Sequence, residues 1–209
     1  MNDISKTTKT NIAILLYLVL FIFLSFGLSF FVAIPSTISL IIFNVLIFLF
    51  IFNGRVNVKQ LWVSGDLVER DKEYYRIITS AFTHEQPMHI LMNMYSLYSI
   101  GSALEIMLGS IMFSVVYFVI GVVGGIIAVI IHHRLNPAIP SIGASGIICG
   151  LLGVYLVLAI QIQGFNAIIN IAPTLILLVM MSFSPRIDSV GHFSGLAIGV
   201  IAGFLLVLF

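Results

Sequence analysis

The chain has 209 residues, of which 60% are hydrophobic and only 8% are charged, with a formal net charge of +1. Typical soluble domains carry about 25% charged residues, so this composition indicates an integral, multi-pass membrane protein without a separate soluble domain. The small net charge gives no reason to expect nucleic acid as a partner, and the single cysteine, Cys149, excludes an intramolecular disulfide. The sequence contains no metal-spaced or cofactor motif, so we expect neither metal nor cofactor.

Apolar runs of the length that crosses a bilayer divide the chain into seven predicted spans. The first, residues 12–34, is longer than the roughly 7–15 residues of a signal-peptide core, so we interpret it as a retained span, with a signal peptide as the alternative. A large first loop, residues 53–86, holds most of the charge. The other predicted spans are residues 36–52, 87–107, 110–131, 143–161, 166–183 and 190–209.

The predicted spans should be helices, because a backbone embedded in lipid has to satisfy its own hydrogen bonds. The alternating pattern of a transmembrane barrel is absent. We therefore predict an all-α polytopic membrane protein. Its N-terminal tail and first span would occupy residues 1–35, and a six-helix domain would occupy residues 36–209.

A serine stands at the start of the fifth predicted span. Ser145 lies between Gly143 and Gly146 in "IGASGIICG", after a segment whose prolines prevent a regular helix. Backbone N–H groups at a helix start are unpaired and the helix dipole is positive there, so an oxyanion formed near Ser145 would be stabilised. From these residues alone, Ser145 is also compatible with a helix N-cap or a small packing residue.

A histidine opens the last predicted span. Behind His192, glycines recur at every fourth residue from Gly191 to Gly203 and form a smooth helix face. The helix that starts at Ser145 has its own glycines, so the two helices could come close enough for a hydrogen bond of about 2.6–3.2 Å. The alternative is an interfacial histidine.

His89 and Asn93 lie four residues apart in "MHILMNMYSL" and therefore share one helix face. Both side chains carry N–H donors, which could stabilise a developing oxyanion together with the Ser145 N–H. The alternative is a pair that forms hydrogen bonds between helices.

Other polar residues indicate support rather than chemistry. We expect His84 to hold the first loop in place and Arg76 to anchor loop backbone or lipid headgroups. His132, His133 and Arg134 follow the fourth predicted span. We interpret these three as solvated interface residues, since no third ligand is spaced for zinc.

Taken together, the motifs resemble those of the rhomboid intramembrane serine proteases. They are "YYRIITSAFTHEQPMHILMNMYSLYSIGSALE", "GASGIICGLLG" and "GHFSGLAIGVIAG", in the order of that family, and the resemblance covers residues 36–209. It implies a six-helix rhomboid core preceded by one extra N-terminal transmembrane helix. It also implies a catalytic dyad, with Ser145 as the nucleophile and His192 as the general base.

The resemblance assigns supporting roles as well. His89, Asn93 and the backbone amides of Ala144 and Ser145 would form the oxyanion hole. Cys149 falls where the family usually has Tyr or Phe against the base, which predicts a more loosely held imidazole. Structural support is expected from His84, Arg76, Glu105, Gly143, Gly146, Gly195 and Gly199.

The implied function is covalent hydrolysis of peptide bonds in or beside transmembrane helices of membrane-protein substrates. The implied setting is a bilayer, as in a bacterial cell membrane. One alternative is a non-catalytic rhomboid-like protein that binds or escorts membrane proteins, although such members typically lose the serine or the histidine. A transporter would show repeated halves and acidic residues inside its spans, whereas this chain shows no such repeat and its Glu105 stands at the end of a span. The sequence leaves the substrate and the oligomeric state open.

Overall fold

The computed structural model describes residues 34–135, 138–169, 172, 176 and 188–208. Within these ranges the chain is helical apart from its loops, with an isolated β-bridge between Val63 and Ser141. The predicted span 12–34 and most of the predicted span 166–183 lie outside the described residues. The six-plus-one helix count and the domain division after residue 35 therefore remain predictions.

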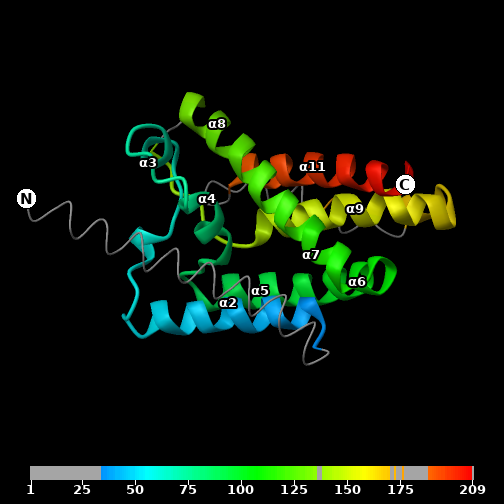
Figure 1. Ribbon diagram of the computed structural model, residues 1–209, viewed down its shortest axis with the longest axis horizontal. Coiled ribbons are helices and arrows are strands. Elements are labelled where there is room, and N and C mark those ends of the chain that lie inside the picture. The colour runs from blue at the N-terminus through cyan, green and yellow to red at the C-terminus, as the bar shows by residue number, and fades with distance from the viewer. Residues whose placement is uncertain (1–33, 136–137, 170–171, 173–175, 177–187, 209) are drawn as a thin grey trace, which may run out of the picture.

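The described helices form a bundle with a lobe of irregular chain at one end (Figure 1). Two helical runs are continuous through a π-helical segment: α5 (Pro87–Ser96) leads through η3 (Leu97–Gly101) into α6 (Ser102–Leu108), and α7 (Ser110–Val119) leads through η4 (Ile120–Gly124) into α8 (Gly125–Leu135). The remaining elements are α2 (Ser36–Phe52), η1 (Val58–Gln60), α3 (Gly65–Glu69), α4 (Arg76–Thr79), η2 (Ser80–Phe82), α9 (Ser145–Gln163) and α11 (Ser189–Leu208).

Three of the described helical runs are long and apolar enough to cross a membrane. They are Ser110–Leu135, Ser145–Gln163 and Ser189–Leu208, and Ser36–Phe52 is a shorter apolar helix. These bounds lie within a few residues of the corresponding predicted spans, because the length of an apolar run and its flanking Pro or Gly residues are local features of the sequence.

The start of α2 is capped by a side chain from a distant helix. Glu105 in α6 accepts hydrogen bonds from the backbone N–H groups of Ser36 (2.6 Å) and Thr37 (2.9 Å), and from the Ser110 hydroxyl. Pro35 precedes this helix, and no local side chain caps it. The Glu105 carboxylate therefore supplies the acceptor that the first turn of a helix lacks.

Helices α9 and α11 lie side by side (Figure 1). A Cβ atom on Gly195 would overlap the Gly146 carbonyl, and one on Gly199 would overlap the Gly150 carbonyl. Contacts therefore advance along both helices in the same direction, so the helices are parallel. Their first turns consequently meet at one end of the bundle.

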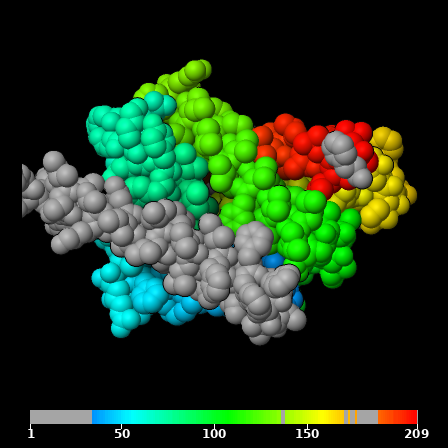
Figure 2. Space-filling view, viewed as in Figure 1, coloured from blue at the N-terminus to red at the C-terminus, as the bar shows by residue number. Residues whose placement is uncertain are grey.

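The first loop forms a lobe beside α8, which Figure 2 shows as a continuous surface at one end of the molecule. Gly65 in α3 lies directly against the backbone of α8, where an added Cβ would be 2.7 Å from the Cα atom of His133. The loop is thus packed onto the helix bundle near the first turns of α9 and α11.

Candidate active site

Ser145 and His192 come together at the start of the parallel helix pair. Ser145 is the first residue of α9 and His192 lies in the first turn of α11. The His192 Nε2 atom is 2.8 Å from the Ser145 Oγ atom, and His192 is only 8% exposed. This is hydrogen-bond distance between a hydroxyl and an imidazole.

Glycine on both helices permits this approach. Besides the Gly195 and Gly199 contacts, a Cβ on Gly146 would be 3.2 Å from the Gly191 carbonyl oxygen. Without side chains in between, the two backbones pack against each other over successive turns. Cys149, one turn after Ser145, is buried in α9. Contact between the two backbones therefore fixes the distance between the first turns of α9 and α11.

His89 and Asn93 on α5 lie against the loop that leads into α9. Gly143 has φ +106°, and a Cβ there would be 2.7 Å from the His89 Cε1 atom and 3.6 Å from the Asn93 Nδ2 atom. The Asn93 amide donates one hydrogen bond to the His89 carbonyl at 3.1 Å. A carboxamide has two N–H donors, and an imidazole carries at least one. The structure thus brings both side chains next to the residues that precede the serine.

The backbone amide of Ala144 has a partner of its own. Its N–H donates to the His84 Nε2 atom at 3.4 Å, and both residues are fully buried. Burial, together with the neighbouring His89, lowers the pKa of His84 to about 3, so its imidazole is neutral and can accept this bond. An oxyanion near Ala144 would compete with His84 for this N–H, and the oxyanion role expected for the Ala144 amide stays a prediction.

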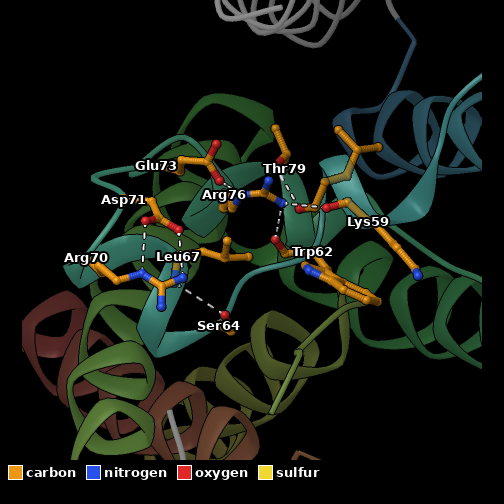
Figure 3. A network of polar contacts seen from close by, with 10 residues as sticks. Lys59, Trp62, Ser64, Leu67, Arg70, Asp71, Glu73, Arg76 and Thr79 are labelled. Atoms are coloured by element: carbon orange, nitrogen blue, oxygen red, sulfur yellow. Dashed lines mark hydrogen bonds and ion pairs between the residues drawn. The ribbon is translucent and has the colours of Figure 1, made fainter. Parts of the chain in front are cut away.

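Arg76 anchors the first loop rather than lipid headgroups (Figure 3). Its guanidinium donates to the carbonyl oxygens of Lys59 (2.9 Å) and Trp62 (2.8 Å), and it pairs with Glu73 at 2.6 Å. Thr79 adds a hydrogen bond to the Leu61 carbonyl at 3.0 Å. The loop segment before α3 is therefore held in place by hydrogen bonds from the buried side chains of Arg76 and Thr79.

One cluster beside the dyad was not recognised in the sequence. The Asp188 carboxylate accepts hydrogen bonds from the Gly191 N–H (2.8 Å) and the Ser141 hydroxyl, and it lies 2.7 Å from the His132 Nε2 atom. The expectation that His132 is solvated is wrong: it is 9% exposed, because it faces this carboxylate, whereas His133 is exposed. An aspartate directly before an apolar helix is a typical N-cap and was the available signal.

The dyad and this cluster line a common cavity. Its walls include Ser145 and His192 as well as Ser141, His132 and Asp188. Gly121, Gly124 and Gly125 contribute a wall without side chains from η4 and α8. Ser145 and His192 therefore both border this space.

Comparison with known proteins finds rhomboid proteins among those similar to this chain. The family model described as "Rhomboid domain" matches residues 71–209. The chain is 37% identical to Rhomboid-like protease 2 of Toxoplasma gondii over 64% of its own length and 48% of that protein. It is 31% identical to RHOMBOID-like protein 5 of Arabidopsis thaliana over 68% and 47%, respectively. It is 32% identical to Rhomboid protease GluP of Bacillus subtilis over 62% and 25%.

The chain spans about half the length, or less, of these curated relatives. The family match nevertheless covers most of the chain, including Ser145 and His192, and the apolar helices identify an integral membrane protein. This chain belongs to the rhomboid family.

Proposed function

We propose that the protein is an intramembrane serine endopeptidase that cleaves transmembrane helices of membrane-protein substrates, with Ser145 as nucleophile and His192 as general base. The observation that carries the proposal is the 2.8 Å contact between the His192 Nε2 atom and the Ser145 Oγ atom at the start of α9. Named proteases among the relatives support the same reaction class.

The chemistry follows from this contact. His192 takes the proton of the Ser145 hydroxyl as the oxygen attacks the scissile carbonyl carbon, and it then gives that proton to the leaving amine. Cleavage of the peptide C–N bond leaves an ester on Ser145. A water molecule, deprotonated by His192, attacks that ester and regenerates the serine. The open cavity beside the dyad offers water a route to the ester.

Stabilisation of the oxyanion is assigned to His89, Asn93 and the Ser145 N–H. The two side chains lie against Gly143, and the Ser145 N–H belongs to the first turn of α9, where it has no acceptor within the helix. Donors held in place before the reaction need no reorganisation as charge develops. The lipid bilayer would supply the substrate laterally, and location in a bacterial cell membrane stays a prediction.

The experiment uses the full chain in detergent and in lipid vesicles. Wild type should react with a serine-directed fluorophosphonate and cleave a reporter that contains a transmembrane helix, whereas Ser145→Ala should do neither. His192→Ala should lose turnover by several orders of magnitude, since loss of one dyad member disables the other. Cleavage by Ser145→Ala would refute the nucleophile assignment. A wild type that neither reacts nor cleaves would instead favour a non-catalytic binder of membrane proteins.

The oxyanion assignment has a matched control within the chain. Asn93→Ala should lower kcat by about 10²–10³, as for loss of one oxyanion donor. Asn44 is also buried and also donates to the carbonyl four residues earlier, from Nδ2 to the Leu40 oxygen at 2.8 Å, but it lies in α2. Asn44→Ala should leave kcat per folded molecule unchanged. Equal effects of the two substitutions would contradict the role of Asn93.

A further inference from the structure

Asp188 occupies the N-cap position of the helix that carries the proposed base. Its side chain accepts from the Gly191 N–H, three residues later, and its carbonyl accepts from the His192 N–H at 3.1 Å. This is the bonding of an N-cap residue, which satisfies donors in the first turn. The first turn of α11, and with it the backbone of His192, is therefore fixed to Asp188.

The same carboxylate reaches two other segments. It accepts from the hydroxyl of Ser141, which lies in the loop that leads to Ser145, and it lies 2.7 Å from the His132 Nε2 atom near the end of α8. Ser141 is itself held by two backbone hydrogen bonds to Val63, of 2.8 and 3.1 Å. We call Asp188, Gly191, Ser141 and His132 the Asp188 cluster.

Gly191 leaves the space that this arrangement requires. A Cβ atom on Gly191 would overlap the Asp188 carboxylate. The carboxylate can therefore lie flat against the first turn of α11 while facing Ser141 and His132. Its side chain is only 15% exposed.

The charge state fits this bonding. Burial alone would raise the pKa of Asp188, but hydrogen bonds from His132, Ser141 and Gly191 outweigh it and lower the pKa to about 2. The group is thus an anion at neutral pH and accepts from several donors at once.

We infer that Asp188 is a positioning residue for the Ser145–His192 dyad: through the Asp188 cluster it joins the chain that enters α9 to the first turn of α11. The inference rests on the proposed peptidase function and deepens it. The carboxylate acts through the backbone of His192 and through Ser141, four residues before Ser145. It holds the two reacting side chains at bonding distance without taking part in proton transfer.

The helix contact alone does not account for this alignment. Glycine packing between α9 and α11 sets how far apart the helices lie, but it is not directional. Hydrogen bonds to a fixed carboxylate define how the first turns are oriented. A misplacement of about 1 Å between reacting groups can cost on the order of 10²-fold in rate.

The test compares Asp188→Ala and Asp188→Asn with wild type in detergent, with kcat expressed per folded molecule from thermal unfolding. Asp188→Ala should lower kcat by about 10–100-fold with KM unchanged, and it should slow fluorophosphonate reaction at Ser145 in parallel. Asn is also a good N-cap residue, so Asp188→Asn should recover most of kcat. Such recovery would not follow if the carboxylate were a proton carrier.

Glu105→Ala is the matched control. Glu105 is likewise a carboxylate that accepts backbone N–H groups and a serine hydroxyl at a helix start, but it does so for α2. Its loss should lower the unfolding temperature and leave kcat per folded molecule as in wild type. A fall in kcat equal to that of Asp188→Ala would overturn a specific positioning role.

Ser141→Ala keeps the inference testable if Asp188→Ala does not fold. It removes one partner of the carboxylate and leaves the helix cap in place, and it should lower kcat in the same sense but by less. Wild-type kcat in Ser141→Ala, or in Asp188→Ala where that variant folds, would overturn the inference.

A change in KM alone would also overturn it, since it would mean that Asp188 contacts substrate. Failure of the inference is distinct from failure of the proposed function. In the first case wild type cleaves, Ser145→Ala does not, and the Asp188 variants behave like wild type. In the second case wild type itself shows no serine-dependent cleavage.

Discussion

The α9–α11 interface and the first loop hold the same site by different means. The two helices meet through glycines, so that Gly199 packs on the backbone of Gly150 with no polar side chain between them. The loop is held by a buried guanidinium, Arg76, which donates to the carbonyls of Lys59 and Trp62. Helical backbone satisfies its own hydrogen bonds and needs only a complementary shape, whereas irregular backbone needs added donors.

This difference predicts two kinds of sensitivity. The helix interface should fail when volume is added, even by a single methyl group. The loop should fail when a donor is removed, and it should tolerate added volume better because short segments can shift. Four substitutions test this contrast, in decreasing order of expected effect.

Gly199→Ala should be the most damaging of the four. The new Cβ would overlap the Gly150 carbonyl, so the helices would have to separate, at a cost of about 1–3 kcal/mol or more. The dyad would separate as well, so fluorophosphonate reaction at Ser145 should be lost. Thermal unfolding in detergent measures the first effect. Ala197→Val on the exposed face of the same helix is the control. An unfolding temperature of Gly199→Ala equal to that of wild type would contradict the predicted sensitivity of the helix interface to added volume.

Arg76→Ala should come next. It leaves the Lys59 and Trp62 carbonyls without their donor and Glu73 without its partner, at about 1–3 kcal/mol for each buried group left unsatisfied. Arg76→Lys should recover only part of the lost protection against proteolysis, because one ammonium group cannot reproduce the forked donors of a guanidinium. The rate of limited proteolysis in the loop is the measurement. Protection equal to wild type would show that the loop does not depend on these bonds.

Gly65→Ala adds volume to the first loop at the point where α3 packs against α8. A Cβ there would lie 2.7 Å from the His133 Cα atom, so α3 would have to move away from α8. The helix has only five residues and can shift as a unit, so the cost should fall near the lower end of the overpacking range, about 1 kcal/mol. Faster proteolysis of the loop with little change in unfolding temperature is expected. A loss of stability as large as that of Gly199→Ala would contradict the contrast.

Arg70→Ala should have the smallest effect. Arg70 pairs with Asp71 at 3.0 Å, but its side chain is 71% exposed, and exposed ion pairs contribute little. Unfolding temperature and proteolysis should match wild type. The variant also controls for loss of a positive charge in the first loop, as distinct from loss of the Arg76 hydrogen bonds. A measurable destabilisation would mean that charge, rather than burial, matters in this loop.

Much of the helical framework was predictable because it depends on local features. Apolar runs bounded by proline or glycine predicted helices near residues 36–52, 110–131 and 190–209, and the structure has helices there. The i, i+4 spacing of His89 and Asn93 predicted that they share a helix face, and both lie against Gly143. Such features need only the geometry of a helix and the thickness of a bilayer.

The bonding partners were decided by the tertiary structure. Ala144 and His84 are 60 residues apart in sequence, and His132 and Asp188 are 56 apart. No local pattern states which helix ends will meet, so neither the burial of His132 nor the contact between the Ala144 amide and His84 could be predicted from the sequence. By itself the sequence determined which residues could react, since side-chain chemistry and helix position are local. Only the packing of α8, α9 and α11 decided what holds them in place, because that depends on which surfaces exclude lipid and water together.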